Sequence, residues 1–456
     1  MTGPSFPLSP PFRLETRANL RLAVPLVLAQ LSFVGMGAVD TIIAGRLGGP
    51  QLAAVAVGAN LWFMLFVPFM GLFMAVSPIV AQRHGAGRPG VETGGFLRGA
   101  VALAFLVGIV WLLSLRLGAG PVLDLLQLEP VTRGYCDGYV HAVAWSAIPL
   151  SLFFALRNGA EGYGQTRTTL WAGLSGFTVN ALLAYGLANG RWGLPALGPT
   201  GCGIATVIGG ATMVAAFLLM YRWHPRLREL ALLRPGWPRL EAQTGEIFRI
   251  GAPIALIVTA EAWLFLIGAL LMARFGTTVV AAHQIAINFA SLTFMVPMSI
   301  GMATSVRVGH AVGAGAAPAV LRLRGYAGIA LGALFALLSA SLMALAPHPI
   351  VGAYTQVADV AALAVRFLYY AAVFQIADCV QATANGALRG LKDTRVPMLI
   401  TVSAYWLIGF PIAIGLAFDA GIGPAGIWGG FIGGLAAAAA GLSLRFRHET
   451  RSLHST

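Results

Sequence analysis

Charged residues are scarce in this sequence, and their scarcity excludes most soluble folds. Asp, Glu, Lys and Arg together make up 10% of the 456 residues, whereas an ordinary soluble domain has about 25%. With 58% hydrophobic residues, the chain has too little polar surface for a water-soluble enzyme of this length. We therefore expect an integral membrane protein.

Cysteine is also rare, and catalytic motifs do not stand out. Cys136, Cys202 and Cys379 are odd in number and widely spaced, so they predict neither a disulfide framework nor a metal-binding knuckle. We find no nucleophile paired with a base and no phosphate-binding glycine loop. The chain has no room for the soluble nucleotide domain of an ATP-driven pump. We expect a protein that is not an enzyme and needs no cofactor.

Long apolar stretches between the charges predict the fold class. A transmembrane helix needs about 20 apolar residues, and a porin-like barrel would show shorter alternating segments. Twelve candidate spans are present: 22–44, 52–81, 99–115, 138–156, 168–190, 192–221, 250–273, 275–306, 325–346, 367–388, 396–418 and 420–444. The expected fold is an all-α integral membrane protein with twelve transmembrane helices.

The placement of Lys and Arg predicts the orientation of these spans. Twelve spans place both termini on one side, and the loops and tails of that side carry all of the 29 Lys and Arg residues except six. The six on the opposite side are Arg46, Arg116, Arg133, Arg191, Arg274 and Arg366. Positive residues concentrate on the cytoplasmic side, so both termini are expected in the cytoplasm. The net charge of +13 then reflects contact with anionic lipid, and no nucleic-acid partner is required.

An internal repeat, offset by half the chain length, divides the sequence into two similar halves. Pro25 matches Pro253, Arg46 matches Arg274, and the segment 162–167 matches 390–395 without gaps. Two six-helix lobes of equal orientation, related by a pseudo-two-fold axis along the membrane normal and meeting at a cavity, are a transporter architecture. The expected domains are a cytoplasmic tail (1–19), an N-terminal lobe (20–223), a cytoplasmic linker (224–247), a C-terminal lobe (248–447) and a second cytoplasmic tail (448–456).

Three acidic residues lie inside predicted spans, namely Asp40, Glu261 and Asp378. A carboxylate at mid-membrane costs about 2.5–3.5 kcal/mol on insertion scales, so it needs a wet cavity and a compensating partner. Every Arg and the single Lys lie at span ends in this interpretation. The acids therefore form sites for a proton, Na⁺ or a cationic substrate, and Glu261 with Asp378 are the candidate Na⁺ ligands.

The repeat and one amide refine this picture. No acid is repeated between the two halves, so Asp40 in one lobe and Glu261 with Asp378 in the other are expected to form two separate charge sites. Asn180 lies in the middle of the fifth span and is a candidate partner of Asp40, although an ordinary interhelical amide is an equal alternative.

The motifs around these residues resemble one family of transporters. They are Val39–Gly45, the placement of Glu261 in the seventh span, Ser305–Gly315, and Asp378 followed by Gly386–Arg395. Together they are similar to the multidrug and toxic compound extrusion (MATE) family, most closely to its bacterial NorM-type branch. The resemblance covers about residues 20–446. It departs from some members at Gly176, where they carry Asn, and at Phe374, where they carry Tyr.

The resemblance implies a secondary antiporter of the bacterial inner membrane, working as a monomer among membrane lipids. It would export amphipathic, often cationic drugs and dyes in exchange for Na⁺ or H⁺. The family's acidic and polar positions match Asp40, Glu261, Asp378 and Asn180. Two alternatives remain open. A lipid-linked saccharide flippase of related architecture would favour a basic cavity, and an intramembrane enzyme would need convergent catalytic groups.

Overall fold

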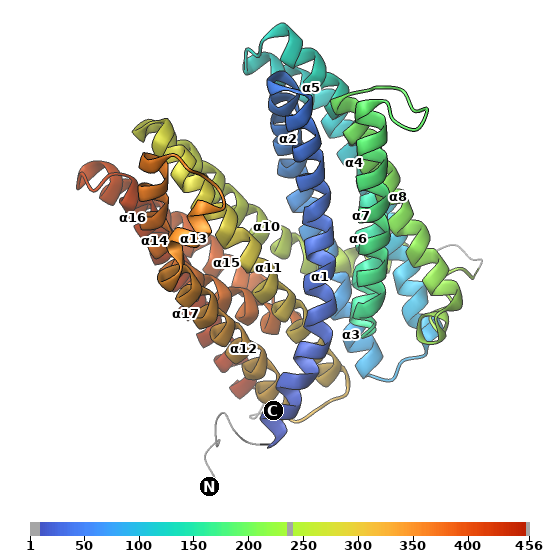
Figure 1. Ribbon diagram of the computed structural model, residues 1–456. Helices are drawn as coiled ribbons and strands as arrows, with labels where there is room; N and C mark the ends of the chain where they lie inside the picture. The colour runs from blue at the N-terminus through green and yellow to red at the C-terminus, as the bar shows by residue number, and fades with distance from the viewer. Residues whose placement is uncertain (1–9, 235–239, 453–456) are drawn as a thin grey trace. The chain divides into compact units, whose positions relative to one another are not determined.

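The computed structural model describes residues 10–234 and 240–452, and these residues form a helical protein without β-strands (Figure 1). Twelve helical segments in these ranges are long and apolar enough to cross a membrane, which confirms the expected number. Eleven of the twelve spans are longer than the apolar stretches that predict them, because helices continue into the charged residues at their ends. The third span, for example, covers Gly90–Leu125 instead of 99–115. The sixth span, Pro199–Trp223, is shorter than its predicted stretch 192–221.

Each half of the chain supplies six spans. The N-terminal half contains α1 (Pro10–Leu47), α2 (Gly49–Phe73) continued by α3 (Val76–Gly85), α4 (Gly90–Leu125), α5 (Pro130–Val143) continued by α6 (Ala147–Gly162), α7 (Thr166–Asn189) and α8 (Pro199–Trp223). The C-terminal half contains α10 (Leu240–Met272), α11 (Thr277–Gly313), α12 (Pro318–Leu345), α14 (Ala358–Gly390), α15 (Arg395–Ser403) continued to α16 (Phe410–Ile414), and α17 (Pro424–Ser452). Two short helices, α9 (Pro225–Arg228) and α13 (Pro347–Gly352), lie in connections.

Backbone conformation at the turns follows the internal repeat. Gly48 and Gly276 occupy equivalent positions of the two halves, and they precede α2 and α11 with φ of 143° and 99°. Gly164 and Lys392 are also equivalent and have φ of 78° and 60°. Left-handed φ is uncommon outside glycine, so Lys392 shows that the second turn keeps its conformation although its glycine is lost.

A close helix crossing is also repeated. A methyl group added to Gly162 would lie 2.5 Å from the carbonyl oxygen of Ser77, and one added to Gly390 would lie 2.7 Å from that of Ser305. The two glycines are equivalent in the repeat, and so are the two serines. Small residues let helix backbones approach in membrane proteins, and here they join α6 to α3 and α14 to α11 in the same way.

A further glycine on α14 yields a prediction about stability. A methyl group on Gly386 would lie 2.2 Å from the carbonyl oxygen of Gly301 on α11. We expect Gly386→Ala to destabilise the protein by about 1–3 kcal/mol, because overpacking forces the two backbones apart. Thermal unfolding in detergent would measure this. The matched control is Gly118→Ala in α4, where an added methyl group meets no atom within 4 Å. A melting temperature equal to wild type in Gly386→Ala would contradict this crossing.

The chain divides into two compact units, whose limits differ from the expected lobes. The first, here called the N-terminal unit, is Pro25–Ala255. The second, here called the C-terminal unit, combines the described residues of Met1–Val24 and Leu256–Thr456. The helix α1 begins at Pro10, so residues 10–19 are helical and are not a tail. The expected limits were placed at the charged residues that separate the apolar stretches. The helices α1 and α10 continue through those charged residues, so the limits of the units differ.

Part of the predicted linker 224–247 packs against α4. Leu230 is fully buried and packs so closely on α4 that a methyl group on Gly94 would lie 1.6 Å from its carbonyl oxygen. Arg98 donates hydrogen bonds to the carbonyl oxygens of Ala231 and Arg234. Residues 235–239 lie outside the described residues. This connection therefore packs as part of the unit Pro25–Ala255.

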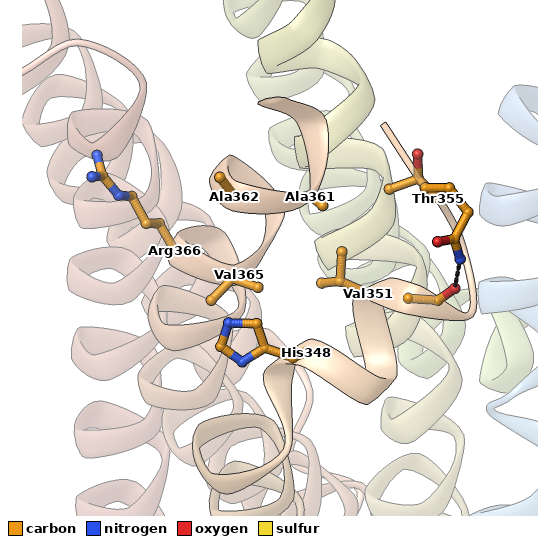
Figure 2. Close-up of a pocket in the computed structure, with 9 residues that line it drawn as sticks. His348, Val351, Thr355, Ala361, Ala362, Val365 and Arg366 are labelled. Carbon is orange, nitrogen blue, oxygen red and sulfur yellow. Dashed lines mark hydrogen bonds between the residues drawn. The ribbon is translucent and has the colours of Figure 1, made fainter. Parts of the chain in front are cut away.

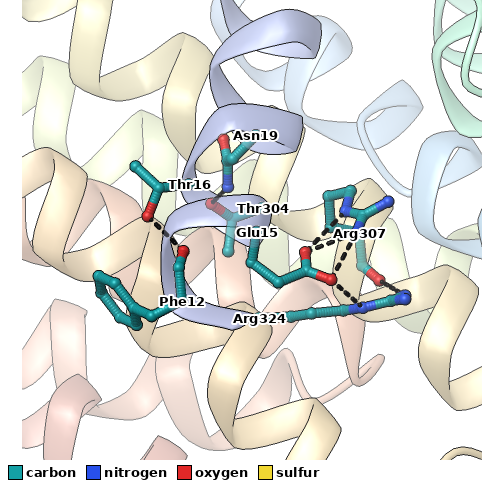
Figure 3. Close-up of polar contacts among 7 residues, drawn as sticks. All are labelled: Phe12, Glu15, Thr16, Asn19, Thr304, Arg307 and Arg324. Carbon is teal, nitrogen blue, oxygen red and sulfur yellow. Dashed lines mark hydrogen bonds and ion pairs between the residues drawn. The ribbon is translucent and has the colours of Figure 1, made fainter. Parts of the chain in front are cut away.

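Polar contacts attach the start of α1 to the C-terminal unit (Figure 3). Glu15 accepts hydrogen bonds from Arg307 of α11 at 2.6 and 3.1 Å, and its carboxylate lies 3.3 Å from Nε of Arg324 of α12. Asn19 donates to the hydroxyl of Thr304 at 2.8 Å. These contacts join the first helix to residues of the other half of the chain, so no local sequence pattern predicts them.

We expect Glu15→Gln to lower stability by about 1 kcal/mol, since ion pairs that keep some solvent exposure are worth about 0–1 kcal/mol and a pair that belongs to a network lies at the upper end of that range. A thermal melt would show a small decrease in melting temperature. Glu92→Gln, which removes the half-exposed pair with Arg88, should leave the melt unchanged. A larger loss in Glu92→Gln than in Glu15→Gln would contradict the importance of this network.

Candidate functional site

Asp40 lies in a polar site inside the N-terminal unit. It is 3% exposed on α1, and its Oδ2 accepts a hydrogen bond of 3.0 Å from the hydroxyl of Thr206 on α8. Asn180 of α7 donates to the same hydroxyl at 3.4 Å. The structure therefore brings Asp40 and Asn180 together through Thr206, a residue that the sequence interpretation missed.

The hydroxyl of Thr206 has two acceptors and one proton. Besides Asp40, the carbonyl oxygen of Cys202 lies 3.2 Å away. A hydroxyl group donates only one hydrogen bond at a time. The Oδ1 atoms of Asp40 and Asn180 are both buried without a hydrogen-bond partner among the described residues. This site thus has more acceptors than donors.

Glu261 lies in a second polar site, inside the C-terminal unit. Its Oε2 accepts hydrogen bonds from Nε2 of Gln381 at 3.2 Å and from the hydroxyl of Tyr405 at 3.3 Å. Asp378 lies on α14 one turn before Gln381, is 3% exposed, and interacts electrostatically with Glu261. The structure therefore brings the two predicted acids of this half together.

A widened helical turn carries Tyr405 in this site. Residues Ala404–Gly409 form a π-helical segment between α15 and α16, and Pro411 follows it. Proline lacks the N–H of the regular helix and clashes with the preceding turn, and π-helical turns often occur at functional sites. The wider turn shifts Tyr405 away from regular helical spacing, which explains why the sequence interpretation did not find it.

One cation influences Glu261 from the end of a helix. Arg389, at the end of α14, interacts electrostatically with Glu261. In the described part of the chain, however, neither Glu261 nor Asp378 forms an ion pair within 4 Å. Arg389 lies one residue before the end of α14. Glu261 is therefore influenced by a positive charge without forming an ion pair with it.

The oxygen atoms of the second site fit a small cation. Oδ1 of Asp378 and Oε1 of Gln381 are buried without a hydrogen-bond partner in residues 10–234 and 240–452. Hard cations prefer carboxylate and carbonyl oxygens. Within those same ranges no group of three or more His, Cys, Asp or Glu is close enough to hold a metal ion. The donor set is thus two carboxylates with neutral oxygens.

Packing accounts for the two positions at which the chain departs from some relatives. A side chain on Gly176 would collide with Met213, 2.3 Å from its Cβ position. Phe374 is buried, with ring centroids 5.7 Å from Phe265 and 6.0 Å from Trp428. Neither position contributes a polar atom to a carboxylate site.

The position of Arg157 along the sequence predicts that it belongs to the basic residues of the cytoplasmic loops. The structure places it inside a helix instead. It is 2% exposed on α6 and forms an ion pair of 2.6 Å with Glu161, which is 1% exposed. Glu161 thus joins Asp40 and Asp378 among the buried acids of the described residues. Because Arg157 and Glu161 are one turn apart at the end of an apolar stretch, the sequence showed them only as span-end charges.

A surface pocket of about 510 Å³ in the C-terminal unit is separate from these sites (Figure 2). His348 and Val351 of α13 and Val365 and Arg366 of α14 contribute to its lining. None of the predicted site residues lines it. The pocket therefore adds nothing to the chemistry of the carboxylates.

Comparison with known proteins supports the repeat and the architecture. The family model described as MatE matches the chain twice, over residues 25–186 and 253–414. The starts and the ends of the two matches are displaced by the same half chain length, in agreement with the internal repeat.

Similar proteins cover nearly the whole chain. Multidrug resistance protein PmpM of Pseudomonas aeruginosa is 38% identical, over 99% of this chain and 95% of its own length. Multidrug resistance protein NorM of Burkholderia vietnamiensis is 40% identical, over 95% and 94%.

Solved structures of low sequence identity show the same fold. The eukaryotic MATE transporter AtDTX14 has a TM-score of 0.87 at 20% identity, covering 98% of this chain and 99% of its own. The Vibrio cholerae MATE transporter VcmN in the bent form has a TM-score of 0.84 at 18% identity, with the same coverage.

Proposed function

The chain belongs to the MatE family of multi-pass membrane transporters, and we propose that it is a secondary active multidrug efflux antiporter. It exports amphipathic, often cationic drugs and dyes in exchange for Na⁺ or H⁺ moving inward. The names of its relatives PmpM and NorM, both multidrug resistance proteins, support export of drugs. The coupling role rests on the geometry of the two carboxylate sites.

The observation that carries the proposal is a surplus of buried acceptor oxygens at each site. Among the described residues, Asp40 and Asn180 of the N-terminal unit each have an unpartnered oxygen, as do Asp378 and Gln381 of the C-terminal unit. Leaving a buried acceptor unsatisfied costs about 1–3 kcal/mol, and more for a charged group. A proton or Na⁺ arriving at the site removes this cost.

At Asp40 the natural ligand is a proton. With Asp40 ionised, Thr206 donates to its carboxylate, and the carbonyl oxygen of Cys202 receives no bond from that hydroxyl. With Asp40 protonated, the acid becomes a donor, and Thr206 is free to donate to Cys202. Protonation therefore changes the bonding between α1 and α8.

At Glu261 and Asp378 either cation fits. Two carboxylates in mutual electrostatic contact repel each other when both are ionised, and a bound cation relieves this repulsion. A site neutralised in this way costs less to remove from water, which favours a different conformation of the transporter. Drug and coupling cation then compete, either for an acid or through the conformation that each one stabilises.

The energetics depend on the charge balance. The membrane potential supplies about 2.3 kcal/mol per charge per 100 mV. If one monovalent drug cation leaves for each coupling cation that enters, the exchange is electroneutral and the potential cancels. Concentration gradients alone then drive export, at about 1.4 kcal/mol per tenfold ratio.

The proposal also includes the membrane location, the orientation and the oligomeric state of the protein. We place the protein in the bacterial inner membrane with both termini in the cytoplasm, because the basic residues concentrate in the loops of that side. Its lipid contacts are those of any multi-pass protein, and it functions as a monomer. Co-reconstitution with an inactive variant tests the last point, since a monomer's activity falls only in proportion to dilution.

Reconstituted proteoliposomes loaded with a cationic dye test the function directly. Efflux should accelerate when an opposing gradient of Na⁺ or of protons is imposed, with the two gradients varied independently. A rate of dye efflux that changes with neither gradient would exclude the antiporter function. Efflux of a lipid-linked saccharide instead of the dye would support the flippase.

A further inference from the structure

The buried pair of Arg157 and Glu161 in the N-terminal unit takes no part in either carboxylate site. Nε of Arg157 donates to Oε1 of Glu161 at 2.6 Å, and the two side chains are 2% and 1% exposed. Burying an ion pair costs several kcal/mol per ion, and replacing one by apolar residues is often neutral or stabilising. A buried pair inside a membrane helix therefore needs a reason beyond stability.

Arg157 and Glu161 connect three helices of the unit. Nη1 of Arg157 donates to Oε1 of Gln30 on α1 at 2.7 Å. Oε1 of Glu161 accepts from the hydroxyl of Thr169 on α7 at 3.2 Å. Arg157 is thus bonded to α1 on one side, while Glu161 fixes the orientation of the guanidinium from the other.

Aromatic packing reinforces the contact with α1 at the same level. The guanidinium carbon of Arg157 lies 5.7 Å from the ring centroid of Phe154. Phe154 in turn meets the ring of Phe33 edge-on at 5.8 Å. Phe33 lies three residues after Gln30, on the same side of the helix. The segment of α1 from Gln30 to Phe33 therefore makes a polar contact and an aromatic contact with α6.

This segment lies on the helix that carries Asp40. Pro25 lies inside α1 five residues before Gln30 and is the first residue of the N-terminal unit. A proline in a helix removes one backbone hydrogen bond and permits bending. Asp40 follows Gln30 by ten residues, about 15 Å along the axis. A rotation of α1 at Gln30 therefore moves the Asp40 carboxylate relative to Thr206.

The buried residues of α1 show how tightly rotation is specified. Leu26, Ala29, Met36, Asp40 and Ile43 are all less than 7% exposed and recur at spacings of three, four or seven. Most of this stripe is apolar and tolerates small rotations, because apolar contacts have no directional preference. The charged hydrogen bond at Gln30 is directional.

We propose that Arg157 is a positioning residue for cation coupling: oriented by Glu161, it fixes the rotation of α1 through Gln30 and so presents Asp40 to Thr206. This role rests on the proposed function of Asp40 as a coupling site. Nη2 of Arg157 and Oε2 of Glu161 remain buried without hydrogen bonds among the described residues. These missing hydrogen bonds reduce the stability that the ion pair contributes, which fits a role of the pair in orienting α1.

Two near-isosteric variants separate positioning from general stability. Gln30→Met removes the acceptor on α1 and leaves the ion pair in place. Thr169→Val removes the other bond to the pair and leaves α1 untouched, so it is the matched control. In proteoliposomes we expect Gln30→Met to raise the cation concentration for half-maximal efflux about tenfold with little change in maximal rate. Thr169→Val should stay within about twofold of wild type.

A spectroscopic readout tests the position of α1 without transport. Spin labels at Ile42 of α1 and Leu182 of α7, which are 57% and 54% exposed, report a distance within the N-terminal unit. Gln30→Met should broaden or shift this distance distribution, and Thr169→Val should not. Arg157→Lys keeps the charge but loses the planar fork, and it should behave like Gln30→Met.

The outcomes distinguish this proposal from the proposed function. Equal effects of Gln30→Met and Thr169→Val, or an unchanged distance in Gln30→Met, would overturn the positioning role. A changed distance with wild-type cation dependence, in a protein whose wild type shows coupled efflux, would overturn the link to coupling. If the wild type shows no coupled efflux, the proposed function fails, and the distance measurement alone still decides whether Arg157 positions α1.

Discussion

Asp378→Asn is expected to abolish cation-coupled efflux while the protein still inserts and folds. The substitution keeps the shape of the side chain but removes its charge, so the site beside Glu261 no longer attracts a cation. Because the coupling cation then loses one of its two charged ligands, we expect a loss of about 100-fold or more in the coupled rate, equivalent to about 2.8 kcal/mol or more. Dye efflux from proteoliposomes under a Na⁺ or proton gradient measures it.

The control for this experiment lies on the same helix. Asp359, in the first turn of α14, is exposed, and Asp359→Asn should transport like wild type. Both variants should elute as single species and melt near the wild-type temperature. Coupled efflux at the wild-type rate in Asp378→Asn would show that the acids of the C-terminal unit are not needed for coupling.

The second large effect is expected for Asp40→Asn. An asparagine at this position can accept a hydrogen bond from Thr206 but cannot release or bind a proton, so the bonding between α1 and α8 stays in one state. We expect coupled efflux to fall by about 10- to 100-fold, equivalent to about 1.4–2.8 kcal/mol. Asp124→Asn, which changes a surface carboxylate of the same unit that is 73% exposed, should have no effect.

A binding measurement shows whether the two sites are separate. Purified Asp40→Asn should still bind the coupling cation at Glu261 and Asp378, as followed by radiolabelled Na⁺ or by proton uptake, whereas Asp378→Asn should lose that binding. The expectation follows from the placement of the acids in different compact units. Loss of all cation binding in Asp40→Asn would show instead that the sites act as one.

The acids of the two carboxylate sites could be predicted from the sequence one residue at a time. Asp40, Glu261 and Asp378 stand out because an acid inside an apolar span is costly and therefore rare. Their partners do not stand out. Thr206, Gln381 and Tyr405 are polar residues that membrane helices tolerate without cost, and only Gln381, one turn after Asp378, had a helical spacing that pointed to the site.

The buried pair of Arg157 and Glu161 shows a different limit. Both residues lie next to the expected end of a span, where charges normally face water, so their position along the chain indicated a loop. The structure buries them because Gln30 and Thr169, from two other helices, supply hydrogen bonds. Whether a charge at a helix end is buried depends on such neighbours, and one helix does not identify them.

By itself the sequence determined the number of spans, the repeat of its two halves and the acids that lie inside the spans. These properties depend on composition and periodicity along one chain, since the bilayer forces every span to be apolar and helical. The tertiary structure alone decided where α1 and α10 pass from one compact unit to the other, which side chains complete each carboxylate site, and how Arg157 contacts α1. Those features depend on side chains that are distant in sequence, and packing in three dimensions selects among many helices of similar apolar character.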